Sequence, residues 1–332
     1  MIIENFNPFY GKHCETTTVG NLLRNCGLEL SEPLIFGVGE GLSFIYWDSK
    51  QMEFPFLGGR CKPDILTENI VKNLNLSIEL YQTSSRSKAW DNVKSKIDNN
   101  IPVGLKLDCY HLEYFTQKIH FAGHYVTIYG YDNDFAYLID TDQQGSDVKT
   151  SLVSLADARS EKGPMSSKNR SFTIIRRNDP PNLKDVIISA INHNAYEYLN
   201  PPIQNISFKG IRKTAKVIGN WFERPGMTPE LIIQAGTLME RAGTGGGLFR
   251  NMYRDFLGEC NDLYPDLNLK NPNEKFCTIA DMWTEVSNLI CKAGENSNEQ
   301  YLKEASLILL EIASLEEEAM KILFEKTSIF HK

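Results

Sequence analysis

The sequence lacks the features of membrane and secreted proteins. No apolar run approaches the roughly 20 residues that a membrane-spanning helix needs. The N-terminus MIIENFNPFYGKHC lacks the basic region followed by an apolar one that marks a signal peptide. There is no low-complexity run, and 42% hydrophobic and 23% charged residues are typical of a globular protein. We therefore expect a cytoplasmic globular protein.

Metal and redox motifs are missing too. The seven cysteines are odd in number and scattered, and no two of them form a CxxC pair. This pattern indicates free thiols in a reducing compartment. The cysteines are Cys14, Cys26, Cys61, Cys109, Cys260, Cys277 and Cys291. His111 and His120 flank LEYFTQKI without a cysteine or carboxylate at a ligand spacing, so the sequence predicts no metal site.

The chain has no excess of basic residues. Its formal net charge of −7 argues against non-specific binding of nucleic acid, which needs a basic surface. An acidic surface would instead tolerate or attract a cationic small molecule. We expect neither a nucleic-acid nor a membrane partner, and a homodimer is left open.

The character of the sequence changes near RRNDPPNLKD, between Asn178 and Lys184. Before this stretch, strand-like segments such as PLIFGVG and HYVTIYGY alternate with helical ones, which predicts an α+β domain over residues 1–178. After it, helical periodicity continues with almost no strand signal, which predicts a mostly α-helical domain over residues 184–332. The two prolines among polar residues indicate a linker.

A helix predicted in YGKHCETTTVGNLLRNCG carries two cysteines in different settings. Apolar residues recur at helical spacing from Val19 to Cys26, and Gly27 fits the position just past a helix end. Cys14 lies at the N-terminal end, where the exposed N–H groups and the helix dipole favour a thiolate. Its neighbour His13 is not expected to be the base, because adjacent side chains of a helix point apart.

The segment GHYVTIYGYDNDFAYLID offers a base and a residue to orient it. It is predicted to be a hairpin in which His124 opens one strand and Asp140 closes the other. With a three-residue turn at 132–134, Asp140 lies across from Val126 and on the same face as His124. A two-residue turn would place the pair on opposite faces. Catalysis therefore requires a three-residue turn or a bulge.

Each of these residues also has a plain structural explanation. A cysteine at a helix start can pack, a histidine at a strand start can be a hydrogen-bonded or exposed residue, and an aspartate after YLI can simply end the strand. Their joint occurrence, in the order Cys, His, Asp with about 110 residues between nucleophile and base, favours catalysis. That order is shared with papain-like proteins.

Four stretches resemble the butirosin biosynthesis protein H family. They are HCETTTVGNLLRNCG, SEPLIFGVGEGLSFIY, GHYVTIYGYD with YLIDTD, and AGTGGGLFRNMYRDFL, and they cover nearly the whole chain in the family's order. The resemblance implies a papain-like N-terminal domain and a helical second domain. It also implies an acyltransferase that moves an aminoacyl group from an acyl-carrier-protein thioester to an aminoglycoside amine.

The resemblance assigns site residues as well. Cys14 would be the nucleophile, His124 the base and Asp140 its orienter. Glu40 in GVGEGL stands where a small residue is expected in relatives, which could alter what the pocket accepts. No glutamine precedes Cys14 to complete a papain-type oxyanion hole, so Asn7 is a weak candidate and the Cys14 backbone N–H would have to supply much of that role.

The glycine-rich stretch AGTGGGLFR is not a phosphate-binding loop, because no Lys-Ser or Lys-Thr follows it. It is explained by a break between two helices. The functional alternative is that the bare backbone of Gly245 and Gly246 lines the substrate path, with Arg250 nearby for an anionic group.

A basic stripe is predicted on one helical face of the second domain. Its members, at spacings i, i+3, i+4 and i+7, are Lys209, Arg212, Lys213 and Lys216. Most such stripes are solvated surface, but this one could dock an acidic acyl carrier protein.

The sequence therefore predicts a cysteine-dependent acyltransferase that uses no cofactor of its own, its acyl donor being a phosphopantetheine thioester and its acceptor a small-molecule amine. Two alternatives stay open. The same triad with water as acceptor would make a peptidase or amidase, and a packed Cys14 would leave a non-catalytic binding protein.

Overall fold

The computed structural model describes residues 1–50, 52–116, 118–163, 166–241 and 246–331. The chain forms two compact units, and neither is continuous in sequence. Unit 1 comprises Met1–Ile35 and Pro63–Pro181, and unit 2 comprises Phe36–Lys62 and Asn182–Lys332. None of the described helices is both long enough and apolar enough to cross a bilayer.

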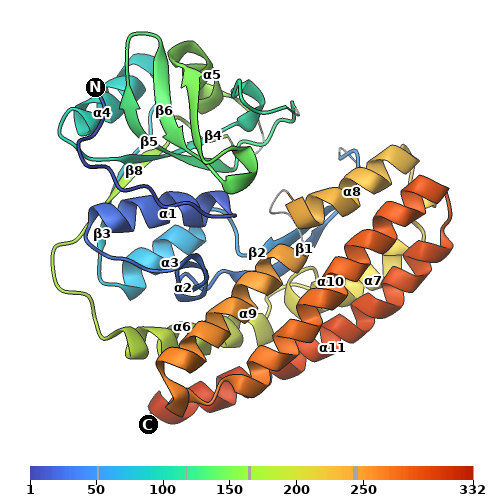
Figure 1. Ribbon diagram of the computed structural model, residues 1–332. Coiled ribbons are helices and arrows are strands. Elements are labelled where there is room, and N and C mark those ends of the chain that lie inside the picture. Colours follow the sequence, from blue (N-terminus) through green and yellow to red (C-terminus); the bar gives the residue numbers. More distant parts are fainter. Residues whose placement is uncertain (51, 117, 164–165, 242–245, 332) are drawn as a thin grey trace. The chain divides into compact units, whose positions relative to one another are not determined.

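Unit 1 is built on a six-stranded sheet in the order β3-β8-β4-β5-β6-β7 (Figure 1). Every neighbouring pair is antiparallel. The strands are β3 Ser77–Tyr81, β4 Val103–Leu107, β5 His124–Tyr131, β6 Phe135–Ile139, β7 Asp147–Ser151 and β8 Ser171–Ile175. An antiparallel sheet combined with separate helices is the α+β pattern that the sequence predicts.

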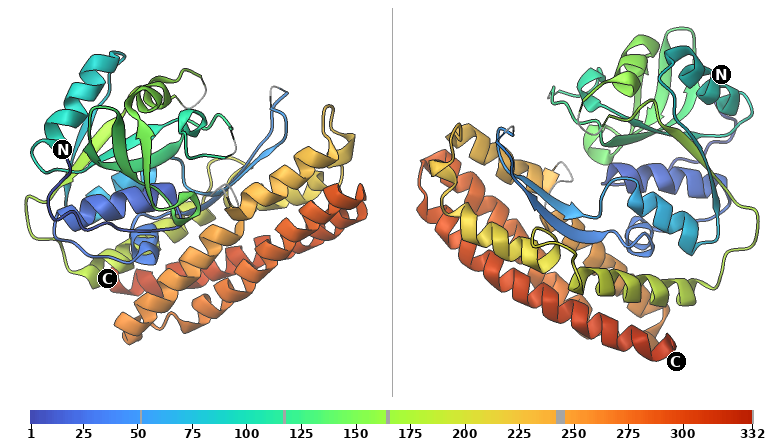
Figure 2. Two further views of the ribbon diagram at one scale, coloured as in Figure 1. Left: turned by 45° about the horizontal axis from the view of Figure 1, so that its top comes forward. Right: turned by 180° about the vertical axis from the view of Figure 1, so that it is seen from behind.

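Helices cover both faces of this sheet, with α1 and α3 on one side and α4 and α5 on the other (Figures 1 and 2). The helices are α1 Cys14–Asn25, α3 Ile65–Asn73, α4 Arg86–Ile97 and α5 Leu152–Ser160, with short 3-10 turns at Cys109–His111 and Asp142–Gln144. Strands β4 and β5 are buried because apolar side chains of α4 and α5, among them Val93 and Leu155, pack on their inward-facing residues.

Helix α1 is the central helix of unit 1. It begins at Cys14, as its sequence predicts, but every residue from Glu15 to Leu23 is buried, not only one face. Asn21 is one of its buried polar side chains that is satisfied internally: it accepts from the N–H of Phe9 and donates to the Phe9 carbonyl (2.8 and 3.0 Å). Gly27 follows the helix with φ of +72°, a conformation that glycine adopts without strain.

Some segments differ from the sequence prediction. PLIFGVG, expected to be strand-like, lies mostly in helix α2 (Glu32–Val38), and β7 and α5 were not expected. Short apolar runs do not distinguish a buried strand from a buried helix, because both lack a polar face.

Unit 2 is a helical assembly that carries a β-hairpin (Figures 1 and 2). The hairpin is β1 Leu42–Trp47 and β2 Phe56–Arg60. The helices are α6 Leu183–Leu199, α7 Ser207–Ile218, α8 Pro229–Arg241, α9 Gly246–Leu263, α10 Lys270–Asn296 and α11 Gln300–Ser328. Helix α10 packs on α8, α9 and α11, while α11 also contacts α6 and α7.

The hairpin corrects the predicted domain boundaries. The last change of unit, after Pro181, falls in the predicted linker. Residues 36–62, however, were assigned to the first domain and fold with unit 2. The reason is packing: β1 contacts α7, and the Phe44 ring lies 5.4 Å from the ring of Trp283 in α10. A single cut in the sequence cannot describe such an insertion.

Candidate active site

Cys14 is the first residue of α1, where helix geometry leaves its backbone N–H without an intrahelical acceptor. The segment before it is fixed by Glu32. The Glu32 carboxylate accepts hydrogen bonds from the backbone N–H groups of Lys12 and His13 (both 2.9 Å) and from the Thr16 hydroxyl (2.7 Å). These bonds hold the helix entry in one conformation and so set the direction of the Cys14 side chain and N–H.

His13 is not placed as a base for its neighbour. Its ring is 3% exposed, and its Nδ1 lies 3.3 Å from the hydroxyl of Thr16, within the same helical turn. The backbone carbonyl of His13 also accepts from the hydroxyls of Thr16 and Thr17 (2.9 and 2.8 Å). His13 therefore belongs to the packed entry of α1.

The β5–β6 hairpin has a two-residue turn and a bulge. The backbone N–H of Asp132 donates to the carbonyl of Phe135 (2.9 Å), which leaves two residues in the turn. The register then shifts by one between Ile128 and Gly130, so that Tyr129 is an extra residue in β5. The turn alone would put the two catalytic candidates on opposite faces, and the bulge reverses this.

His124 and Asp140 consequently lie on the same face and in contact. Beyond the bulge Thr127 pairs with Ile139, a register that continues to Val126 opposite Asp140. The Nε2 atom of His124 is 2.8 Å from Oδ2 of Asp140, and the two side chains are 9% and 0% exposed. The catalytic hypothesis required a three-residue turn or a bulge, and the hairpin contains the bulge.

His124 also contacts the cysteine. Burial of the ring lowers the pKa of His124, but the Asp140 carboxylate and a hydrogen bond to the Cys14 side chain outweigh burial and raise it well above its usual value. Because Nε2 is held by Asp140, Nδ1 is the nitrogen that faces the thiol. Cys14, His124 and Asp140 therefore form one hydrogen-bonded chain.

Two aromatic residues, which the sequence analysis did not single out, complete this arrangement. The Tyr114 hydroxyl donates to Oδ2 of Asp140 (2.8 Å), and burial together with that carboxylate raises the pKa of Tyr114 well above its usual value. The Phe115 ring meets the His124 ring edge-on at 5.3 Å. The Thr141 N–H donates to the other oxygen of Asp140 (2.6 Å). No sequence spacing indicates Tyr114 and Phe115, because they come from the irregular β4–β5 connection.

Asn7 is in the wrong place for an oxyanion hole. It lines a surface hollow together with Arg24 and Asn25, at the C-terminal end of α1, whereas Cys14 is at the N-terminal end. A helix of this length spans about 18 Å. The candidate is therefore incorrect, and the Cys14 N–H is the donor that helix geometry aims at the nucleophile's surroundings.

Glu40 is buried in unit 2 with an unusual backbone. Its φ is 53°, a left-handed conformation that glycine takes more readily, which fits the expectation of a small residue at this position. Its carboxylate is 8% exposed and lies 2.5 Å from Nδ1 of His193. A role in substrate binding stays a prediction, and a cationic group bound there would have to replace or join His193.

Arg250 is not available to a substrate, which corrects the prediction for this residue. Its side chain is fully buried and makes a two-pronged ion pair with Glu316 (2.8 and 2.9 Å), while a third nitrogen donates to the Gly59 carbonyl (2.8 Å). Gly245 lies outside the described residues. Gly246 begins α9, where a Cβ would come within 2.1 Å of Trp283, so this glycine permits close helix packing.

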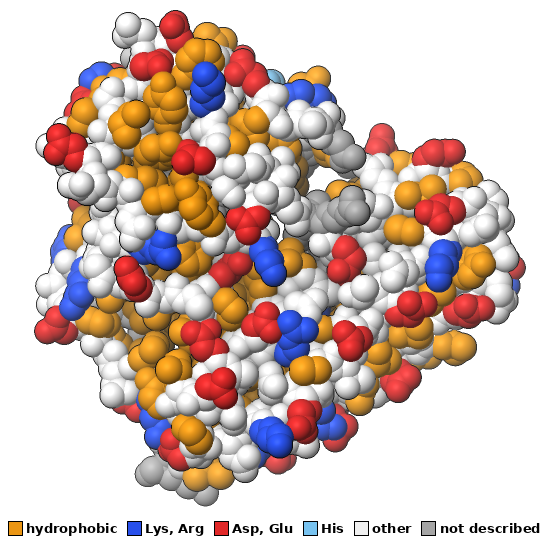
Figure 3. All heavy atoms as spheres, viewed as in Figure 1, with side chains coloured by type: hydrophobic (Ala, Val, Ile, Leu, Met, Phe, Trp, Pro, Cys, Tyr) orange, Lys and Arg blue, Asp and Glu red, His pale blue; other side chains and the backbone are white. Residues whose placement is uncertain are grey.

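The basic stripe lies along α7. Arg212 pairs with Glu317 (2.7 Å) and Lys213 donates to Asn205 (2.8 Å), so two of its cations have partners within unit 2. Lys209 is partly exposed and Lys216 is exposed. Figure 3 shows the other side of unit 2, where α9 and α10 lie in front of α7, and acidic and basic side chains are interspersed there. Carrier docking at this stripe stays a prediction.

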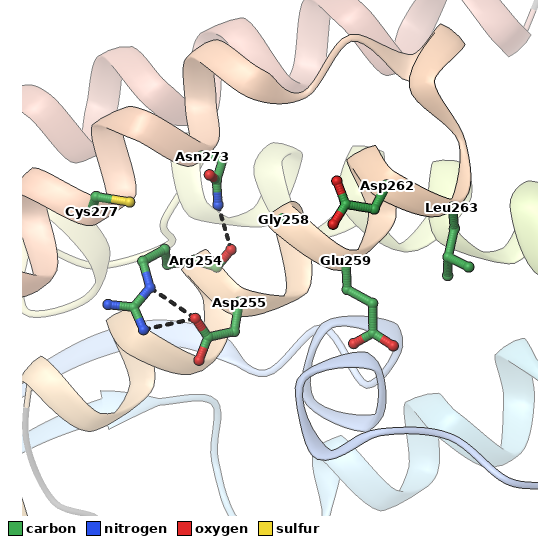
Figure 4. Close-up of a pocket in the computed structure, with 8 residues that line it drawn as sticks. All are labelled: Arg254, Asp255, Gly258, Glu259, Asp262, Leu263, Asn273 and Cys277. Carbon is green, nitrogen blue, oxygen red and sulfur yellow. Dashed lines mark hydrogen bonds and ion pairs between the residues drawn. The ribbon is translucent and has the colours of Figure 1, made fainter.

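A surface pocket on unit 2 contains none of the predicted site residues. It lies between α9 and α10, as Figure 4 shows. The residues that line it are Arg254, Asp255, Gly258, Glu259, Asp262, Leu263, Asn273 and Cys277. Arg254 is paired with Asp255 (2.7 Å), and Asn273 donates to the Arg254 carbonyl (2.6 Å).

Comparison with known protein families gives two matches. A family model described as butirosin biosynthesis protein H, N-terminal, matches residues 13–141, a range that contains Cys14, His124 and Asp140. A second model, described as a domain of unknown function (DUF4872), matches residues 153–323 and covers most of the helices of unit 2. No curated protein matches the chain.

Proposed function

Since the chain belongs to the butirosin biosynthesis protein H family, we propose that it is a cysteine-dependent acyltransferase of antibiotic or related secondary metabolism with a papain-like first unit. The observation that carries this proposal is the hydrogen-bonded chain from Asp140 through His124 to Cys14. A nucleophile on a helix N-terminus, with its base on an adjacent antiparallel sheet, supports the papain-like assignment.

In the proposed reaction, His124 takes the proton of Cys14 and the thiolate attacks the carbonyl carbon of an acyl thioester. The Cys14 N–H stabilises the oxyanion that forms. When the tetrahedral intermediate collapses, the bond to the donor sulfur breaks, and His124 returns its proton to the departing phosphopantetheine thiol. The acyl group is then held on Cys14 as a new thioester.

An amine attacks this acyl-enzyme in the second half of the reaction. His124 accepts the proton from the attacking nitrogen and passes it to the Cys14 sulfur as the carbon–sulfur bond breaks, which gives an amide and the free enzyme. Asp140 holds the ring and stabilises its protonated form in both halves. Attack by water in place of the amine would give a hydrolase, so the acceptor decides between the two activities.

Intact-mass spectrometry after incubation with a small acyl thioester tests the proposal. We expect the wild type to gain one acyl group, Cys14→Ala to gain none, and the matched variant Cys26→Ala, altered at the other end of α1, to behave as the wild type. Added amines should discharge the adduct faster than buffer alone and yield an amide. Equal discharge by water would indicate hydrolysis, and peptide cleavage without reaction with thioesters would refute acyl transfer.

A further inference from the structure

Three potential metal ligands come together beside the candidate active site. They are His111 in the 3-10 turn after β4, His120 before β5, and Glu161 directly after α5. One ligand atom from each lies within 4.8 Å of the other two. The Nε2 atom of His111 is already 2.6 Å from a carboxylate oxygen of Glu161.

We propose that these three residues bind a divalent transition-metal ion such as Zn²⁺. Two imidazoles and one carboxylate are a donor set that zinc uses with water in the fourth position. Ligand atoms around a tetrahedral zinc ion are separated by about 3.3 Å, so the observed spacing needs side-chain rotation and no movement of the backbone. The ion would replace the proton that His111 and Glu161 share.

A neighbouring carboxylate orients one of the ligands. Oδ2 of Asp108 lies 3.2 Å from Nδ1 of His120, which leaves Nε2 of that ring for the metal. The other oxygen of Asp108 accepts the backbone N–H groups of Tyr110 and Phe121 (2.9 and 3.2 Å). A carboxylate behind a metal-binding histidine fixes the ring and raises its basicity. The Tyr110 ring stacks on His120 with ring centres 4.0 Å apart, which restrains the ring further.

The position of this site gives the ion a structural effect. His111 and His120 stand at the two ends of the connection that carries Tyr114 and Phe115, which contact Asp140 and His124. An ion bound by both histidines would close this connection and restrict the positions of the two aromatic side chains. The proposal concerns binding alone and does not rest on acyl transfer.

Equilibrium dialysis of untagged protein against Zn²⁺ tests the proposal, in a Cys14→Ala background so that the thiol contributes no binding. We expect one Zn²⁺ per chain, and a Co²⁺ form with the visible absorption of a tetrahedral site. His120→Phe keeps the stacking on Tyr110 but removes a ligand. Mutation of a residue that hydrogen-bonds to a metal ligand typically lowers metal affinity about 10–100-fold. Asp108→Asn should therefore lower the Zn²⁺ affinity by a factor in that range, and His120→Phe should lower it further.

His193→Ala is the matched control, because His193 is half-exposed, as His120 is, and pairs with a glutamate, as His111 does. Its Zn²⁺ affinity should equal that of the parent. Glu161→Gln, which can still accept a hydrogen bond from His111, should weaken binding with no change in the circular dichroism spectrum. The proposal is overturned if the parent protein binds no Zn²⁺, or if the folded His120→Phe and Glu161→Gln variants bind it as tightly as the parent.

Discussion

His124 is held between two opposing influences. Its burial disfavours the charged ring, whereas Asp140 and the Cys14 sulfur favour it and prevail. In the proposed reaction, the proton that leaves Cys14 therefore has a stable destination on the ring. Two other cysteines lie in surroundings that disfavour a thiolate, because burial raises the pKa of Cys26 and of Cys109.

This contrast predicts selective alkylation. At about pH 6, where an ordinary thiol is almost wholly protonated, iodoacetamide should label Cys14 ahead of the other six cysteines. His124→Ala should abolish the preference, because the thiol then loses its proton acceptor. Peptide mapping by mass spectrometry measures the labelling of each site. Uniform labelling of all seven cysteines in the wild type would count against a catalytic Cys14.

Tyr114 is predicted to be a positioning residue for Asp140. Tyr114→Phe removes the hydroxyl that donates to the oxygen shared with His124. Loss of one buried, charge-assisted hydrogen bond costs about 1.5–3 kcal/mol, so the rate of Cys14 acylation should fall roughly 10- to 100-fold, with little change in KM.

The pH dependence separates this role from a general loss of packing. Without the phenol proton, Asp140 is more negative and stabilises the His124 cation further, so the pKa of His124 should rise. NMR titration of the ring should show this rise, and the alkaline limb of the acylation profile should move to higher pH. If Tyr114→Phe acylates more slowly but neither the pKa of His124 nor the alkaline limb changes, then Tyr114 acts through packing alone.

Among the elements, the β5–β6 hairpin shows how far sequence reasoning reaches. Alternation of apolar residues was sufficient to predict both strands. For His124 and Asp140 to lie on the same face, the hairpin needed one residue more than regular pairing through a two-residue turn provides. Whether that residue lies in the turn or in the strand was not predictable, because a three-residue turn and a bulge both place His124 and Asp140 on the same face. The position at Tyr129 depends on tertiary contacts: its ring stacks on Phe6 at 4.8 Å.

Deletion of Tyr129 should therefore leave the candidate site connected. Without the extra residue, the strands pair regularly from the two-residue turn, and Thr127 still pairs with Ile139 and Val126 with Asp140. His124 and Asp140 then stay on the same face, and we expect the preferential alkylation of Cys14 to be retained. Peptide mapping of the alkylated variant measures this. Loss of the preference in a folded Tyr129 deletion variant would show that the bulge itself, and not only the facing of the two strands, sets the geometry.

The cluster of His111, His120 and Glu161 shows what spacing along the chain cannot reveal. The sequence provided no carboxylate at a ligand spacing from the two histidines, so no metal site was predicted. The carboxylate follows a helix, α5, that the sequence analysis did not anticipate, and the antiparallel sheet brings its end beside the 3-10 turn. Ligands that meet only through tertiary structure leave no local motif.

At the scale of the whole molecule, a buried ionic network joins the two separate chain segments that form unit 2. Arg250 joins α9 to Glu316 of α11 and to the Gly59 carbonyl of the inserted hairpin. The Trp283 indole of α10 donates to the same carboxylate (2.8 Å), and the Tyr198 hydroxyl of α6 donates to it as well. Arginine within a glycine-rich family motif suggested ligand binding, and only its burial shows that it holds four helices and a hairpin together.

Removal of one member of this network should be costly. Glu316→Ala leaves the Arg250 guanidinium buried without a counter-ion, which typically costs about 3–5 kcal/mol. We expect urea unfolding, followed by tryptophan fluorescence, to show a loss of that size in the free energy of unfolding. Glu316→Gln retains an acceptor for Trp283 and should lose less. The control is Glu299→Gln, which breaks the exposed Lys303–Glu299 pair and should cost no more than about 0.5 kcal/mol. Equal effects of Glu316→Ala and Glu299→Gln would show that the buried pair does not stabilise unit 2.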